Sequence, residues 1–211
     1  MRDLVIVGAG GHGRELFATV AAINAATPTW RILGFVDDDP QHLDRVERLG
    51  SRVLGDTAWL ESNPGYYAIG IGTSAVRRDI TARLEAAGCE PTTIVHPGAH
   101  IGLDVRLGEG VVIYDRCTIT TNVDIGTHTH LNVGCTIHHD TTVGDFVQFS
   151  PGVFVNGDCA IGNDVFLGTG MILVRGSRLG DFARVGAGSV VLRDVDPSIT
   201  VMGIPARSRE G

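Results

Sequence analysis

The stretch IGLDVRLGEGVVIYDRCTITTNVDI, residues 101–125, carries an isoleucine or leucine at every sixth position. The same step runs from Val95 to Val191, and all seventeen positions hold a large apolar residue. The chain is 43% hydrophobic, so chance would supply only about seven of the seventeen. A strict period of six fits neither a helix, with a period of about 3.6, nor a strand, with a period of two. It predicts a solenoid of short strands and sharp corners, with one apolar side chain per step turned inward.

A second column of mostly small or β-branched residues lies four positions after the first, from Ala99 to Val195. Three of the four cysteines, Cys117, Cys135 and Cys159, fall in this column. Free cysteine behaves as a small buried hydrophobe, so we expect structural thiols rather than redox or catalytic ones. If three sides close one coil, residues eighteen apart stack at the roughly 4.8 Å spacing of neighbouring strands.

The first ninety residues follow a different pattern, in which apolar strands alternate with helical segments. We expect strands at residues 4–7, 32–36, 53–54 and 67–71, and helices at residues 14–25 and 75–87. This alternation indicates a small parallel α/β sheet. Thr73 or Ser74 is expected to cap the second helix. We therefore predict two domains, residues 1–90 and 91–211.

The turn at residues 8–13 reads GAGGHG, follows the first strand and opens the first helix, as a dinucleotide-binding turn does. Asp37 lies where a ribose-binding acid is expected, so an NAD-dependent enzyme is one hypothesis. A dinucleotide fold uses two such halves, however, and one half suffices only for a mononucleotide or nucleoside diphosphate. The turn suits an anion, with Gly72 and Thr73 beside it. The alternative is that its glycines only make tight turns.

Composition narrows the class of protein further. The net charge is -7, and this argues against general binding to nucleic acid or to an anionic membrane. No apolar run approaches the ~18 residues of a membrane span, and the first strand is too short for a signal peptide. The cysteines form neither a CxxC pair nor a zinc spacing, which fits a reducing compartment. We therefore expect a cytoplasmic protein.

The glycine turn, the segment Gly34-Phe35-Val36-Asp37-Asp38 and the hexapeptide solenoid follow one another in an order that resembles one family. It is the sugar O/N-acyltransferase family of hexapeptide-repeat acetyltransferases, which includes sialic acid O-acetyltransferases and UDP-4-amino-sugar N-acetyltransferases. The resemblance covers essentially the whole chain. It implies a Rossmann-like mononucleotide-binding domain followed by a left-handed parallel β-helix. It also implies a homotrimer, acetyl-CoA between neighbouring β-helices, and a nucleotide-linked sugar held by the N-terminal domain.

Residues 131–140 look like the family's catalytic stretch. By that match His139 is the general base, and Asp140 orients it and raises its basicity. Gly157 lies eighteen residues later, so it should sit one coil above His139 with its N–H open to an acyl carbonyl. An imidazole suits proton abstraction at neutral pH. His138 should point to the opposite side of its strand.

Four histidines, His128, His130, His138 and His139, lie within one and a half coils. Such a cluster could bind a metal, or its members could simply face solvent. No pair of them has the eighteen-residue spacing that brings stacked side chains together. We therefore expect no metal.

The resemblance assigns the family's nucleotide-sugar contacts to seven residues of the first domain. They are Gly10, Gly11, His12, Asp37, Asp38, Gly72 and Thr73. Four solenoid residues fall where the family contacts CoA, namely Gln148, Thr169, Ala187 and Arg207. One residue in each set departs from the family pattern. Gln148 stands where family members often have histidine, and Thr73 stands where they often have asparagine. Both changes leave the sugar, the nucleotide and the acyl group open.

These observations predict transfer of an acetyl group from acetyl-CoA to the amine of a nucleotide-linked amino sugar. The thioester is already activated, so positioning and proton transfer should suffice without a covalent intermediate. Two alternatives stay open: acylation of a sugar hydroxyl or transfer of another acyl group, and a non-catalytic solenoid that serves as a binding module. The sugar, the nucleotide and the pathway do not follow from the sequence.

Overall fold

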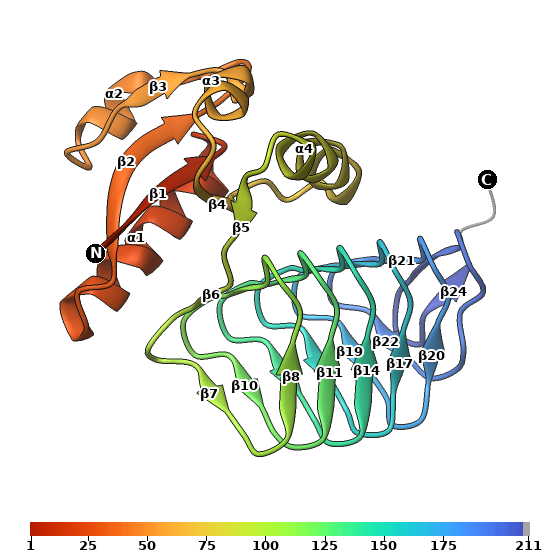
Figure 1. Ribbon diagram of the computed structural model, residues 1–211. Helices are drawn as coiled ribbons and strands as arrows, with labels where there is room; N and C mark the ends of the chain where they lie inside the picture. The colour runs from red at the N-terminus through yellow and green to blue at the C-terminus, as the bar shows by residue number, and fades with distance from the viewer. Residues whose placement is uncertain (209–211) are drawn as a thin grey trace. The chain divides into compact units, whose positions relative to one another are not determined.

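A computed structural model describes residues 1–208 and divides the chain into two compact units, Met1–Pro97 and Gly98–Gly211 (Figure 1). The division falls between residues 97 and 98, where the sequence suggested 90 and 91. The first unit is an α/β domain and the second is a parallel β-helix, so the predicted fold class is confirmed. Within residues 1–208, none of the helices is both long enough and apolar enough to cross a bilayer.

The α/β unit is built on a parallel sheet with the strand order β3-β2-β1-β4-β5. Its strands are β1 (Arg2–Val7), β2 (Trp30–Val36), β3 (Val53–Gly55), β4 (Tyr66–Ile69) and β5 (Glu90–Pro91), and β6 (Ile94–Val95) follows them. Its helices are α1 (Gly11–Ala26), α2 (Leu43–Glu47), α3 (Thr57–Ser62) and α4 (Ser74–Ala86). Since β2 and β4 lie on opposite sides of β1, the chain reverses its winding there, which in such sheets places a ligand crevice at the carboxyl ends of the strands.

The four predicted strands and two predicted helices of this unit are present, but α2, α3 and β5 were not predicted. The start of α3 carried a recognisable signal, because the Asp56 carboxylate caps the helix by accepting a hydrogen bond from the Trp59 N–H at 3.3 Å. Thr73 occupies the cap position of α4, but its side chain makes no capping hydrogen bond. The expected hydroxyl cap was therefore wrong.

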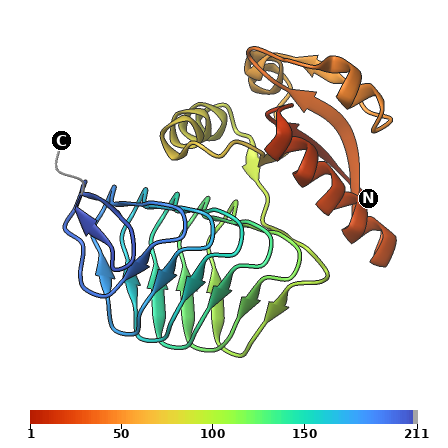
Figure 2. The ribbon, with the colours of Figure 1, turned by 180° about the vertical axis from the view of Figure 1, so that it is seen from behind.

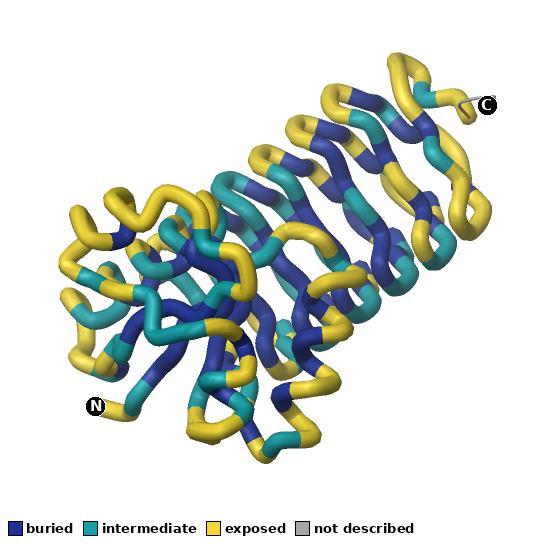
Figure 3. Tube along the Cα trace, turned by 90° about the horizontal axis from the view of Figure 1, so that it is seen from above, coloured by how far each residue is buried: buried dark blue, intermediate teal, exposed yellow. Residues whose placement is uncertain are grey.

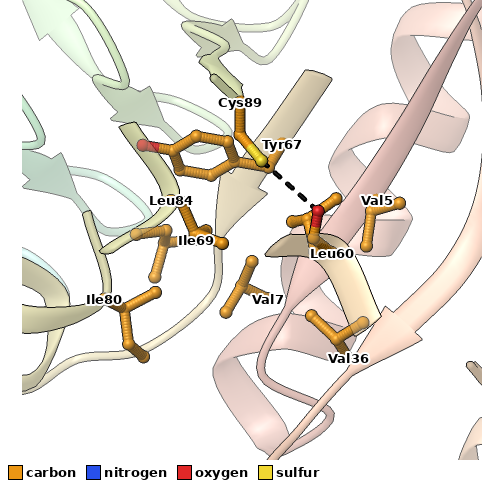
Figure 4. Packing of buried hydrophobic residues seen from close by; sticks show 9 residues of the cluster. All are labelled: Val5, Val7, Val36, Leu60, Tyr67, Ile69, Ile80, Leu84 and Cys89. Carbon is orange, nitrogen blue, oxygen red and sulfur yellow. Dashed lines mark hydrogen bonds between the residues drawn. The ribbon is translucent and has the colours of Figure 1, made fainter. Parts of the chain in front are cut away.

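A cluster of buried side chains fixes the carboxyl ends of β1, β2 and β4 (Figure 4). Its members come from the sheet and from the helices that cover it: Val5, Val7, Val36, Leu60, Tyr67, Ile69, Ile80, Leu84 and Cys89. The Cys89 thiol completes the cluster by donating to the Leu60 carbonyl at 3.5 Å. Close packing of this kind holds the turns that follow these strands in fixed positions.

The solenoid contains three sheets, seen from behind in Figure 2, and their strands are parallel apart from the final strand, β24. One has the order β22-β19-β16-β13-β10-β7, with β7 (His100–Ile101), β10 (Thr118–Ile119), β13 (Thr136–Ile137), β16 (Phe154–Val155), β19 (Ile172–Leu173) and β22 (Val190–Val191). The second has the order β20-β17-β14-β11-β8, with β8 (Val105–Leu107), β11 (Val123–Ile125), β14 (Thr141–Val143), β17 (Ala160–Ile161) and β20 (Arg178–Leu179).

The third sheet runs β24-β23-β21-β18-β15-β12-β9 within this unit. Its strands are β9 (Val112–Ile113), β12 (His130–Leu131), β15 (Gln148–Phe149), β18 (Phe166–Leu167), β21 (Arg184–Val185), β23 (Thr200–Met202) and β24 (Arg207–Ser208). The eighteen-residue register is confirmed, for example by Thr118 beside Thr136 and Thr136 beside Phe154. The first column is buried at every step from Ile113 to Val191, and the predicted buried thiols are also confirmed. Figure 3 shows that short buried segments recur along the coils of the solenoid.

The corners explain the period of six. In each step the third residue after the core position takes a left-handed backbone conformation, with φ between 51° and 79°. These residues are Asp104, Gly110, Arg116, Asn122, His128, Gly134, Asp140, Phe146, Gly152, Asp158, Asp164, Gly170, Gly176, Phe182 and Gly188. A single left-handed residue per step turns the chain sharply, and glycine, asparagine and aspartate tolerate that conformation best.

The last coil departs from the predicted register. Val195 pairs with Leu179 and Val201 pairs with Val185, and both separations are two residues shorter than eighteen. Val195 therefore belongs to the first column. The prediction that it belongs to the second column was wrong. The stack then ends with β24, which pairs antiparallel with β23.

Candidate active site and nucleotide site

His139 and Asp140 form a hydrogen-bonded pair at the corner between β13 and β14. The imidazole Nδ1 lies 2.7 Å from Asp140 Oδ2. A carboxylate only accepts hydrogen bonds, so this contact places the imidazole proton on Nδ1 and leaves the Nε2 lone pair available. The His139 side chain is 44% exposed, so a substrate can reach it.

Gly157 lies one coil after His139, and the imidazole packs against it. A Cβ atom on Gly157 would come within 2.6 Å of both Cε1 and Nε2 of that ring. The Asp158 N–H donates to the His139 carbonyl at 2.8 Å and locks the two coils together. Among the described residues, the Gly157 N–H donates no backbone hydrogen bond. A side chain at this position would displace the imidazole, whereas glycine lets the ring lie against the backbone of the next coil.

The other histidines of this region have different surroundings. The His138 ring packs against Phe154 at a tilt of 45°, with 5.1 Å between ring centroids, and His128 stacks on Phe146 at the same distance. His128 and His130 are buried. Within residues 1–208, no three His, Cys, Asp or Glu side chains are arranged to hold a metal ion.

The residues expected to contact CoA lie away from His139 in the same chain. Thr169 and Ala187 are exposed at the corner between the third sheet and the sheet that contains β13, and the Gly188 N–H donates to the Thr169 carbonyl at 2.8 Å. His139 lies at the next corner, across the width of that sheet. One chain alone therefore does not bring these residues together.

The corner that carries Thr169 has no side chains at the left-handed positions of four successive coils. Its left-handed positions are glycines on four successive coils, Gly134, Gly152, Gly170 and Gly188, and a Cβ atom on any of them would meet no atom within 4 Å. A ligand can therefore approach the backbone closely along this corner.

The two remaining predicted CoA contacts differ in exposure. Gln148 on β15 is buried, and its Nε2 donates to the Phe149 carbonyl at 3.0 Å. Arg207 on β24 is exposed and lines a cavity of about 420 Å³ at the end of the solenoid, together with Arg193 and Asp194. Gln148 is therefore held by its own strand, whereas Arg207 is accessible.

In the α/β unit, the turns after β1 and β4 lie side by side because these strands are parallel neighbours. Gly13 packs on Gly8 so closely that a Cβ atom would lie 1.8 Å from the Gly8 carbonyl oxygen, and one on Gly70 would lie 2.3 Å from the Gly13 Cα. These three glycines make tight packing possible. Gly10 and Gly11 are different, because no such contact demands glycine there and the amino end of α1 is left open.

Asp37 and Asp38 hold the backbone at the carboxyl end of β2. Asp37 Oδ2 accepts a hydrogen bond from the Ala9 N–H at 2.7 Å. Asp38 Oδ1 accepts from the N–H and the hydroxyl of Thr57 at 2.7 and 2.8 Å. These bonds, the backbone one above all, lower the pKa of Asp38. Both acids also line a cavity of about 220 Å³ with Gly8, so they combine a structural role with access to a ligand.

His12 is mostly buried at the amino end of α1. Burial, with a smaller contribution from the charge of Arg77, lowers the pKa of His12 to about 4. The imidazole is therefore neutral at pH 7, and it acts in the turn as a polar group rather than as a cation.

Arg77 on α4 is a residue that the sequence analysis missed. Its side chain is fully buried, and its Nη1 donates to the carbonyls of Ile71 and Gly72 at 2.9 Å each. It therefore shapes the predicted turn at Gly72 and Thr73. A signal was present, because Arg77 shares the apolar face of its helix with Ile80 and Leu84 at spacings of three and seven.

Comparisons with known proteins agree with this architecture. The PglD N-terminal domain model matches residues 3–84. GDP-perosamine N-acetyltransferase of Escherichia coli O157:H7 is 32% identical over 131 residues, which are 61% of this chain and 58% of that protein. The match thus spans little more than half of the curated relative.

Two solved structures resemble the chain over almost its whole length. The acetyltransferase domain of PglB from Neisseria gonorrhoeae FA1090 has a TM-score of 0.91 at 29% identity and covers 99% of this chain and 100% of that one. PerB from Caulobacter crescentus, in complex with CoA and GDP-perosamine, has a TM-score of 0.88 at 28% identity, with 99% and 97% covered. The matched N-terminal domain and the shared two-part architecture confirm the resemblance, read from the motifs, to the sugar O/N-acyltransferase family of hexapeptide-repeat acetyltransferases.

Proposed function

We propose that the protein transfers the acetyl group of acetyl-CoA to the amine of a nucleotide-linked amino sugar. The observation that carries this proposal is the His139–Asp140 pair packed against Gly157 at an exposed corner of the solenoid. The PglB acetyltransferase domain has also been solved with acetyl coenzyme A, and the Caulobacter protein with CoA and GDP-perosamine. Both solved proteins share the two-part architecture of this chain.

In the proposed step, the amine nitrogen attacks the carbonyl carbon of the thioester. His139 Nε2 accepts the amine proton while Asp140 holds the Nδ1–H and stabilises the imidazolium. The Gly157 N–H donates to the oxyanion as charge develops on it. The C–S bond then breaks, and the proton held by His139 passes to the departing sulfur to give the CoA thiol. No metal is needed, because the thioester is already an activated acyl donor.

We further propose that the α/β unit holds the nucleotide part of the amino-sugar substrate. The amino end of α1 offers backbone N–H groups without helical partners, and these favour phosphate. Gly10, Gly11 and His12 form this end, and Gly72 and Thr73 follow the neighbouring strand. The cavity beside Asp37 and Asp38 is of a size to admit part of a base or ribose.

We propose a homotrimer in which neighbouring chains share each active site. His139 and the pair Thr169 and Ala187 lie at different corners of one chain, so a second copy is needed to bring acetyl-CoA to the base. Arg207, which is exposed, would add a further CoA contact, whereas Gln148 is buried in its own strand and is left out of this proposal. Mixing chains that carry His139→Ala with chains that carry Ala187→Trp should restore activity that neither variant has alone. A monomer by light scattering, or no recovery on mixing, would contradict a shared site.

We also propose that the protein works in the cytoplasm. All four cysteines are buried free thiols, as expected in a reducing compartment where disulfides do not persist.

The direct test of the reaction is a screen of UDP-, GDP- and dTDP-linked amino sugars with acetyl-CoA, followed by thiol release. Release that depends on one nucleotide sugar supports N-acetyl transfer, and mass spectrometry of the product separates acylation of nitrogen from acylation of oxygen. Absence of CoA binding would favour the non-catalytic solenoid, and tight binding of NADH would favour the dinucleotide enzyme.

A further inference from the structure

Arg14 lies in the first turn of α1, next to the open glycines. Its Nη1 donates to the Ala9 carbonyl at 2.8 Å, so the guanidinium is tethered to the turn at residues 8–13. Its Nη2 is also the one atom that a Cβ on Gly11 would approach, at 4.0 Å. The guanidinium therefore lies beside the face of Gly11 that is otherwise open.

The Ala9 peptide is held from both sides, because its N–H donates to Asp37 and its carbonyl accepts from Arg14. This arrangement fixes a positive charge relative to the amino end of a sixteen-residue helix that has no acidic residue in its first turn. The guanidinium has five N–H donors, and the contact with Ala9 uses one of them. The remaining donors can serve an anion that also meets the helix N–H groups.

We infer that Arg14 binds a phosphate of the nucleotide-linked substrate, with its guanidinium on one phosphate oxygen and the N–H groups of the turn on others. The inference rests on the proposed function, in which this unit holds a nucleotide sugar. An arginine fork matches a phosphate better than the point charge of a lysine does. Arg14 would thus read the phosphate groups, whereas the cavity beside Asp37 would hold the nucleoside.

Calorimetry with a series of ligands tests whether Arg14 binds the phosphate groups while the cavity beside Asp37 binds the nucleoside. The series is nucleoside, nucleoside monophosphate and nucleoside diphosphate, prepared for both uracil and guanine. Arg14→Gln should weaken binding of the diphosphate by about 10- to 100-fold, as expected for a lost hydrogen bond between charged groups, and leave binding of the nucleoside unchanged. Arg14→Lys should fall between the wild type and Arg14→Gln. Arg31→Gln is the matched control, because Arg31 pairs with Asp3 near the amino end of β2.

The same variants separate this inference from the proposed reaction. In the acetyl-transfer assay Arg14→Gln should raise KM for the nucleotide sugar while kcat and KM for acetyl-CoA stay within about threefold. Wild-type affinity of Arg14→Gln for the diphosphate would overturn the inference and leave the proposed function intact. Equal weakening of nucleoside and diphosphate would also overturn it, because Arg14 would then only shape the turn. If the wild-type protein binds no member of the series, the nucleotide site itself fails.

Discussion

In the solenoid the neighbours of a residue on adjacent coils lie eighteen positions before and after it in the sequence. In the α/β unit the neighbours depend on turns that follow no sequence repeat. Thr118, Thr136 and Phe154 stack because they are eighteen apart. Gly13, by contrast, meets Gly8 and Gly70 because two strands happen to end at the same edge. The difference means that counting alone predicts that Gly157 stacks on His139, whereas the catalytic role of His139 and the nucleotide contacts are predicted only by likeness to a known family.

The largest expected effect tests whether the two regions are separate folding units. Leu131→Ala in the solenoid and Leu60→Ala in the α/β unit each remove a fully buried side chain and should cost about 2–5 kcal/mol. Both tryptophans, Trp30 and Trp59, belong to the α/β unit. In urea unfolding, Leu60→Ala should shift the tryptophan transition, and Leu131→Ala should shift the circular dichroism with little change in tryptophan fluorescence. If the tryptophan and circular dichroism transitions shift together in both variants, the two regions unfold as one unit and the comparison fails.

A second prediction concerns acid and belongs to the α/β unit alone. The pKa of His12 is about 4 in the folded chain against 6.5 for a free imidazole, so the unfolded chain binds the extra proton between these values. The free energy of unfolding should therefore fall as the pH drops from 6.5 to 4, by up to about 3 kcal/mol. His12→Asn should remove most of this slope from the tryptophan transition. An unchanged slope in His12→Asn would show that His12 is not buried as described.

A third prediction concerns the solenoid, and it tests the contact between Gly157 and the His139 ring. Gly157→Ala places a Cβ atom within 2.6 Å of the His139 ring, so the imidazole must move and kcat should fall about 100-fold. Binding of nucleotide should be unaffected, since the proposed nucleotide site lies in the other unit. Gly176→Ala is the control, because its Cβ meets open space and the left-handed conformation costs only about 1 kcal/mol of stability. Wild-type turnover in Gly157→Ala would mean that the ring need not lie there.

The smallest effect concerns the thiols of the second column. Cys135 is fully buried, and its thiol donates to the Ser150 carbonyl at 3.2 Å. Cys135→Ala should cost about 1 kcal/mol and leave turnover within twofold, because the side chain only fills space. Stability is measured by urea unfolding and turnover by thiol release. A large loss of activity without loss of stability would instead give the cysteine a chemical role.

The sequence predicted the solenoid closely because its rule is repetitive. The one error there was Val195, where the last coil is two residues shorter and the step of six no longer holds. A coil that is two residues shorter shifts the register of the coils that follow it. Because this is the last coil, no later residues reveal the shift in the sequence. The closeness of His139 and Gly157 followed from the count of eighteen alone.

The α/β unit was predicted less completely. The strands were found, but Arg77 was overlooked because a buried charge contradicts the rule that places charged residues outside. The expected roles of Asp37 and Asp38 came from resemblance, and the hydrogen bonds they make to Ala9 and Thr57 depend on how distant loops meet. Such contacts arise from tertiary packing, which local sequence patterns do not encode.

Turnover by His139→Ala tests the central claim most directly, with thiol release measured at saturating acetyl-CoA and nucleotide sugar. Loss of a general base should reduce kcat by about 10²- to 10⁴-fold while CoA and nucleotide still bind. The neighbouring variant His138→Ala should keep kcat within a few-fold, because His138 packs against Phe154, whereas the hydrogen bond to Asp140 is made by His139. If His139→Ala keeps more than about a tenth of the wild-type kcat, the base lies elsewhere and the proposed mechanism is wrong.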